Sequence, residues 1–215
     1  MNLQGKKINF LGDSITQGCR TSGFEHCFTE VMARDYGIIS RNYGIGGTRI
    51  AKQQGVENDG NYCDRMNDMD PDADVIVVFG GTNDFGHGNA PIGTFEDRTY
   101  DTFYGAMHVL CRGLIEKYPH ADIMFVTPLH RLNEDNPHGD GYKTDFHSPL
   151  IDYINIIREV TAYYSLPVLD LFAAGQMQPK VDIQKELYMP DGLHPNDAGH
   201  LILARRIARF LETTF

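Results

Sequence analysis

The fold-deciding stretch of this sequence is Phe10-Leu11-Gly12-Asp13-Ser14-Ile15-Thr16-Gln17-Gly18. Its apolar first half, together with the preceding Ile8, predicts a short buried strand, and Gly12 predicts the turn that ends it. Ser14 would then lie at the carboxyl end of the strand, where a helix is about to begin. In an open α/β sheet, this is the edge at which ligands bind.

Strand-like and helix-like segments alternate along the rest of the chain. Apolar and β-branched runs predict strands over 8–11, 38–43, 74–81, 121–128 and 166–172. Helical spacing of apolar residues predicts helices over 25–36, 62–69, 100–118 and 150–164, and a last helix that Asn196 caps. The alternation favours an α/β fold in which helices cover both faces of a parallel sheet, a three-layer sandwich.

Two segments contain too many Gly, Pro, Asn and Asp residues for regular elements. We expect 85–97 to be a loop beside the carboxyl end of the third strand. The 129–148 segment is long for a connection and is expected to form a rim or lid that helps to choose a substrate. His87 and His130 are therefore candidate substrate-rim residues, with a solvated loop histidine as the alternative.

A serine hydroxyl is a poor nucleophile at neutral pH, so Ser14 has meaning only beside a base and oxyanion donors. Asp191-Gly192-Leu193-His194-Pro195 places a carboxylate and an imidazole on one tight turn. The glycine-rich 44–47 turn lets backbone N–H groups approach a ligand closely, and Gly80-Gly81-Thr82-Asn83-Asp84 adds a side-chain amide. Each piece alone also fits ordinary turn chemistry.

Together the four pieces resemble the SGNH-hydrolase, or GDSL esterase/lipase, family. Gly12-Asp13-Ser14 resembles the first family block, Gly47 the centre of the second, Gly81 to Asp84 the third, and Asp191 to Pro195 the fifth. The resemblance therefore covers nearly the whole chain. It implies a five-stranded, flavodoxin-like sheet of order 2-1-3-4-5.

In this interpretation Ser14 attacks an acyl carbon, His194 takes its proton, and Asp191 orients the histidine. The resemblance implies an oxyanion hole made by the backbone N–H groups of Ser14 and Gly47 and the side-chain amide of Asn83, with Gly46 as the alternative to its neighbour. The same Ser, Asp, His order occurs in α/β-hydrolases, but their Gly-x-Ser-x-Gly elbow is absent here.

Three other acidic residues are expected to act structurally. Asp13 and Asp84 would accept backbone N–H groups and so hold the loops of Ser14 and Asn83. Asp170, in the last expected strand, is expected to be a structural cap rather than a rival member of the triad, and His200 on the last helix is expected to be structural. We find no metal-ligand spacing and expect neither a metal nor a cofactor.

The expected function is a serine esterase that cleaves a carboxylic ester through an acyl-enzyme on Ser14. Polar residues in the rim segments favour a short acyl group on a polar or carbohydrate alcohol. The alternatives are a lipase or thioesterase acting on longer acyl chains, an acyltransferase, and a non-catalytic ligand-binding module.

Length and composition fit one domain over residues 1–215. The formal net charge of −10 disfavours nucleic acid and anionic membranes as partners, so a small-molecule ester is the expected partner. The four cysteines form no C-x-x-C pair, which favours reduced thiols. The apolar run after Lys7 is too short for the core of a signal peptide, so a cytoplasmic location is expected. Oligomeric state is left open.

Overall fold

The computed structural model describes residues 1–141, 143 and 145–215, so positions 142 and 144 of the expected 129–148 rim lie outside the described residues. Its five strands form one parallel sheet in the order β2-β1-β3-β4-β5. The strands are β1 (Lys7–Gly12), β2 (Ile39–Gly44), β3 (Val75–Phe79), β4 (Asp122–Val126) and β5 (Val168–Leu169). The predicted sheet and strand order are thus confirmed.

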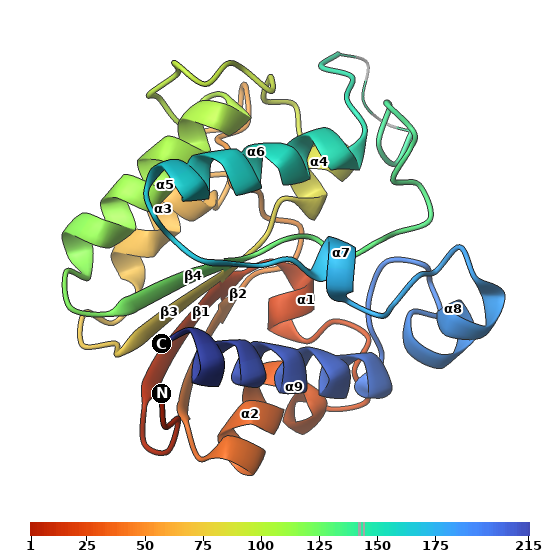
Figure 1. Cartoon of the computed structure of the whole chain (residues 1–215). Helices are drawn as coiled ribbons and strands as arrows, with labels where there is room; N and C mark the ends of the chain where they lie inside the picture. The colour runs from red at the N-terminus through yellow and green to blue at the C-terminus, as the bar shows by residue number, and fades with distance from the viewer. Residues whose placement is uncertain (142, 144) are drawn as a thin grey trace.

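Helices cover both faces of this sheet, as Figure 1 shows. They are α1 (Ser14–Gln17), α2 (Phe28–Tyr36), α3 (Tyr62–Arg65), α4 (Thr82–His87), α5 (Phe103–Lys117), α6 (Leu150–Tyr163), α7 (Leu171–Ala174), α8 (Asp182–Tyr188) and α9 (Asp197–Thr214), with short 3-10 turns η1 (Phe24–His26) and η2 (Met66–Asp68). Helices α3, α5 and α6 lie on one face, and α2 and α9 on the other.

Strand β3 shows why a continuous apolar run predicts a central strand. Its side chains alternate between the two hydrophobic cores: Ile76 and Val78 join the core under α5 and α6, whereas Val75, Val77 and Phe79 join the core under α2 and α9. Because both faces of β3 are buried, all of its residues are apolar. The three-layer sandwich follows directly from this pattern.

The topology brings three loops to one edge of the sheet. Strands β1 and β3 are neighbours, and the chain leaves β1 toward β2 on one side but leaves β3 toward β4 on the other side. Ser14 follows β1, Gly47 follows β2 and Asn83 follows β3, all at the carboxyl ends of parallel strands. This is the topological switch point at which open α/β sheets bind their ligands.

Three predicted elements differ from the structure. The helix expected over 25–36 is interrupted at Cys27, whose extended backbone separates η1 from α2. The loop expected over 85–97 begins later, because Gly81 adopts a left-handed φ of 105° and turns the chain into α4. The strand expected over 166–172 stops at Leu169, because the Asp170 side chain accepts the Ala173 N–H and starts α7.

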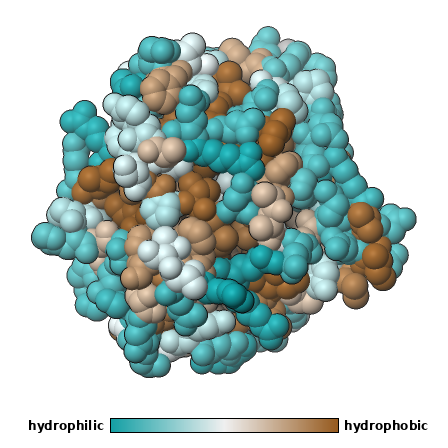
Figure 2. Space-filling model, in the orientation of Figure 1, coloured by the Kyte–Doolittle hydropathy of each residue, from teal (hydrophilic) through white to brown (hydrophobic). Residues whose placement is uncertain are grey.

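The predicted structural roles of Asp170 and Asn196 are confirmed as helix caps. Asn196 Oδ1 accepts the Gly199 N–H at 3.1 Å and begins α9. The space-filling view is mainly hydrophilic, with an apolar patch over α8 (Figure 2). Within the described ranges, no helix combines the length and hydropathy that crossing a membrane requires.

Candidate active site

Ser14 is the first residue of α1, and its hydroxyl faces a histidine from the far end of the chain. Asp13 caps the helix by accepting the Ile15 N–H at 3.0 Å, which fixes the turn after β1. Ser14 Oγ lies 3.0 Å from His194 Nε2. This distance allows the imidazole to accept the hydroxyl proton directly.

The Asp191 turn holds both the position and the tautomer of His194. Asp191 Oδ1 accepts the backbone N–H groups of Leu193 at 2.9 Å and His194 at 2.7 Å, and Oδ2 lies 2.9 Å from His194 Nδ1. Partial burial acts to raise the Asp191 pKa, but these hydrogen bonds outweigh it and lower that pKa. An ionised Asp191 keeps the proton on Nδ1 and leaves Nε2 free as a base.

Arg20 adds a contact that the sequence did not suggest. Its Nε lies 3.2 Å from Asp191 Oδ2, the oxygen that also accepts His194 Nδ1. Since 65 % of the Arg20 side chain is exposed, solvent screens this pair strongly. The ion pair therefore restrains Asp191 only weakly.

The second and third loops bring N–H donors to the same edge. The Gly46 N–H already donates to Gln17 Oε1 at 2.8 Å, which leaves the adjacent Gly47 N–H as the candidate oxyanion donor. Gly47 has a φ of 76°, a conformation that favours glycine. Asn83 is buried, with one N–H of its Nδ2 donated to Thr48 O at 3.0 Å.

Arg65 connects the carboxyl ends of β1 and β2 with the loop that follows β2. Only 9 % of its surface is exposed. Its Nη1 donates to Thr48 Oγ1 at 2.8 Å and to Gly12 O at 3.3 Å, while Nη2 donates to Tyr43 O. No local sequence pattern around Arg65 signals this contact, because its partners come from distant parts of the chain.

Asp84 links the third loop to the second. Its carboxylate accepts the N–H groups of Ile50 at 3.0 Å and Ala51 at 2.9 Å. Burial raises the pKa of Asp84 to about 6, although these hydrogen bonds act in the opposite direction. Burial likewise raises the pKa of Asp13 to about 7. Both carboxyl groups thus accept backbone N–H groups beside the site.

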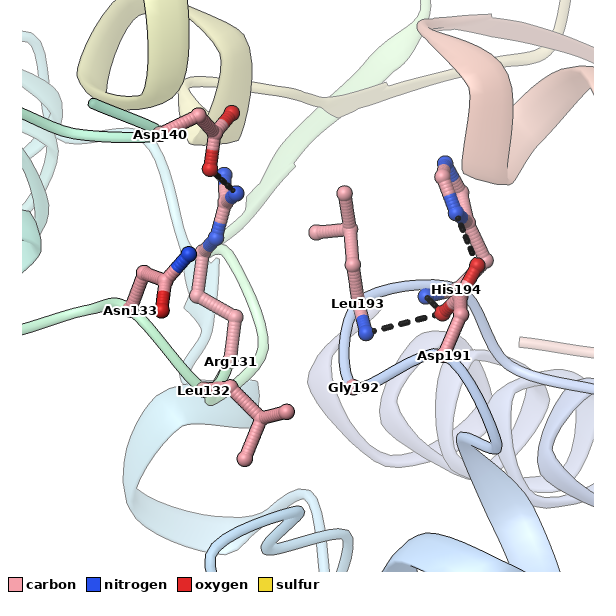
Figure 3. Close-up of a pocket in the computed structure, with 8 residues that line it drawn as sticks. All are labelled: Arg131, Leu132, Asn133, Asp140, Asp191, Gly192, Leu193 and His194. Atoms are coloured by element: carbon pink, nitrogen blue, oxygen red, sulfur yellow. Dashed lines mark hydrogen bonds and ion pairs between the residues drawn. The ribbon is translucent and has the colours of Figure 1, made fainter.

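A cavity of about 370 Å³ opens beside His194. Figure 3 shows one wall from Arg131, Leu132, Asn133 and Asp140, and the facing wall from the 191–194 turn. Arg131 is 4 % exposed, forms an ion pair with Asp140, and donates to Thr82 O at 3.1 Å. The 129–148 segment therefore does border the site, with an ion pair and a leucine on its wall.

The two candidate rim histidines are both engaged with other protein groups. His87 is the last residue of α4, and its Nε2 lies 3.2 Å from Asn83 Oδ1. His130 Nδ1 lies 2.9 Å from Glu134 Oε2, and its ring contacts that of Phe172 at a tilt of 34°, with the ring centroids 3.8 Å apart. Within residues 1–141, 143 and 145–215, no cluster of His, Cys, Asp and Glu has a metal-binding arrangement.

The fold is a three-layer α/β sandwich, and one edge of its sheet brings Ser14, His194 and Asp191 within hydrogen-bond distance. The model of the GDSL-like lipase/acylhydrolase family matches residues 10–202. The chain therefore belongs to the GDSL-like lipase/acylhydrolase family. A comparison with curated proteins finds no match.

Several solved structures share the fold over almost the whole chain. A protein from Lactobacillus plantarum is 31 % identical with a TM-score of 0.86, and the match covers 99 % of both chains. An acetyl-xylooligosaccharide esterase from Geobacillus is 20 % identical with a TM-score of 0.62, over 97 % of this chain and 95 % of that one. A two-domain esterase active on acetylated mannans is 21 % identical with a TM-score of 0.63, over 98 % of this chain and 50 % of that one.

Proposed function

We propose that this protein is a serine esterase that cleaves a carboxylic ester through an acyl-enzyme on Ser14. The observation that carries the proposal is the continuous hydrogen-bonded chain from Ser14 Oγ through His194 to Asp191, at 3.0 and 2.9 Å. Family membership supports it independently. Both hydrophobic cores pack on one sheet, which supports residues 1–215 as one domain.

In the first half-reaction, Ser14 Oγ attacks the ester carbonyl carbon while His194 Nε2 takes the hydroxyl proton. The carbonyl oxygen becomes an oxyanion, which the N–H groups of Ser14 and Gly47 and the Asn83 amide would stabilise. Collapse of the tetrahedral intermediate breaks the bond to the alcohol, and His194 returns the proton to that alcohol. Ser14 is left acylated.

Water completes the cycle by the same route. His194 takes a proton from water, whose oxygen attacks the acyl carbon and forms a second tetrahedral intermediate. Breaking the bond to Ser14 Oγ releases the carboxylic acid, and the serine recovers its proton from His194. If an alcohol replaces the water, the protein acts as an acyltransferase, which product analysis with an added acceptor alcohol detects.

The cavity beside His194 supports a short acyl group on a polar alcohol. Its volume of about 370 Å³ lies near the lower end of the range for small-molecule sites. Asn133 and the Arg131–Asp140 ion pair give it polar groups suited to hydroxyls. The fold neighbours that act on acetylated carbohydrates agree with this preference.

Hydrolysis of p-nitrophenyl esters from acetate to palmitate tests the proposal. We expect turnover to be highest for the shortest acyl groups and to disappear in Ser14→Ala. A maximum at long chains would instead indicate the lipase or thioesterase alternative. A folded wild-type protein that neither hydrolyses any ester nor reacts with a fluorophosphonate at Ser14 would indicate the non-catalytic binding module.

A further inference from the structure

The amide of Asn83 is held at both its oxygen and its nitrogen. Nδ2 donates one hydrogen to Thr48 O at 3.0 Å, and Oδ1 lies 3.2 Å from His87 Nε2. Asn83 is only 5 % exposed. An amide nitrogen carries two hydrogens, so the second N–H of Asn83 remains for a reacting oxygen.

The sequence spacing explains the contact between Asn83 and His87. Both belong to α4, four residues apart, and residues at this spacing lie on the same face of a helix. His87 can therefore reach back over one turn to the amide. The contact requires only that α4 begin at Thr82, which the left-handed Gly81 permits.

Arg49 decides which nitrogen of His87 carries the proton. Arg49 Nη2 lies 2.7 Å from His87 Nδ1. A guanidinium group only donates hydrogen bonds, so Nδ1 must accept, and the single proton of the neutral ring lies on Nε2. Burial and the nearby Arg49 charge lower the His87 pKa, which favours the neutral ring. Nε2–H then donates to Asn83 Oδ1.

We propose that Arg49 and His87 are positioning residues that orient and polarise the Asn83 amide for the oxyanion. Hydrogen bonds in a chain strengthen one another, so a donor at Oδ1 makes the free N–H of Asn83 a stronger donor. It also prevents the amide from flipping its oxygen toward the oxyanion. The inference rests on the proposed esterase function, because it gives Asn83 its role.

This assignment replaces the rim role expected for His87. A rim histidine would offer a ring nitrogen to the substrate, whereas both His87 nitrogens are engaged, one by Arg49 and one by Asn83. The two roles predict different kinetics. A residue that acts through Asn83 changes kcat and loses its effect when that amide is absent, whereas a substrate contact changes KM independently of Asn83.

A double-mutant cycle on p-nitrophenyl acetate separates these roles. Asn83→Ala should lower kcat by about 10²–10³. His87→Leu, which removes both ring nitrogens, should lower kcat about 10-fold at unchanged KM. When His87→Leu is added to Asn83→Ala, the further change should be less than about twofold. Arg49→Met should behave like His87→Leu with a smaller loss.

A conservative variant and a matched control complete the design. His87→Gln places an amide N–H near the position of Nε2 and should recover most of the lost kcat. His120→Leu changes an exposed histidine between α5 and β4, at the opposite edge of the sheet, and should leave kcat unchanged. If His87→Leu does not fold, Arg49→Met carries the same test in the wild-type and Asn83→Ala backgrounds, with His87→Gln as the conservative variant that should keep most of the kcat.

Three results would overturn the proposal: a kcat within twofold of wild type for folded His87→Leu, an equal loss with and without Asn83, or a change confined to KM. If Asn83→Ala loses activity while the His87 and Arg49 variants do not, the esterase function stands and only the positioning role fails. If no ester is turned over, the rate at which a fluorophosphonate labels Ser14 replaces kcat in the same double-mutant cycle. Absence of that labelling overturns both proposals.

Discussion

Replacing Arg65 with Met should loosen the site and destabilise the fold together. The guanidinium donates to Gly12 O at the end of β1, to Tyr43 O near the end of β2, and to Thr48 Oγ1 in the loop after β2. Met has a similar length and no donor, so all of these hydrogen bonds are lost while most of the packing is kept. The ends of β1 and β2 and the loop after β2 then lose the donor that they share.

The expected loss is the balance of two large terms. A hydrogen bond from a charged donor contributes about 1.5–3 kcal/mol, and the Arg65 guanidinium donates to four oxygen atoms, those of Gly12, Tyr43, Thr48 and Gly60. Burying the guanidinium costs several kcal/mol, and this cost is also what lowers the Arg65 pKa. We therefore expect a net loss of about 3 kcal/mol in the free energy of unfolding. For a chain of this size, it corresponds to a Tm lower by about 6–12 °C.

Thermal and urea denaturation of Arg65→Met and Arg112→Met measure this effect. Arg112 lies on α5 with 72 % of its side chain exposed and pairs with Glu116 at the surface, so its replacement should leave Tm unchanged. kcat on p-nitrophenyl acetate should fall only in the Arg65 variant. An Arg65→Met protein with the Tm and kcat of wild type would refute the claim that this side chain holds the two loops.

Three further predictions concern other parts of the site and core. Asp191→Asn should lower kcat on p-nitrophenyl acetate by about 10³–10⁴, because His194 loses the carboxylate that fixes its tautomer; an equal kcat would contradict this. Arg20→Met should leave Tm unchanged and alter kcat/KM less than threefold, because the Arg20 ion pair is exposed to solvent. His200 accepts the Phe28 N–H, and burial lowers its pKa to about 4. As pH falls, His200 therefore takes up its proton in the unfolded chain before it does so in the folded protein. Between pH 7 and pH 5, the free energy of unfolding in urea should fall by about 2 kcal/mol more for wild type than for His200→Asn. Parallel pH profiles of the two proteins would contradict the low pKa of His200.

Local patterns predicted most of the fold because the features that determine it are local. The β3 run is apolar over both faces, and glycines or helix caps end several elements. The predictions failed where the conformation or the side chain of a single residue ends or starts an element. Cys27 breaks a helix despite suitable apolar spacing, and Asp170 converts the end of an expected strand into α7.

The candidate site was predictable only in part. Sequence motifs identify Ser14, Asp191 and His194, and the structure brings these residues within hydrogen-bond distance. Arg49 and Arg65 contact residues far away in the sequence, so no local pattern identifies them. The cytoplasmic location and the absence of nucleic-acid and membrane partners remain predictions from composition.

The mass of the protein after treatment with a fluorophosphonate tests most directly whether Ser14 is the nucleophile. We expect one covalent adduct, mapped to Ser14, that disappears together with ester hydrolysis in Ser14→Ala. Ser22→Ala is the matched control, since the Ser22 hydroxyl donates to the carboxylate of Asp197 at 2.6 Å and not to a histidine as a base. Labelling at another residue, or a Ser14→Ala protein that still hydrolyses esters, would show that Ser14 is not the nucleophile.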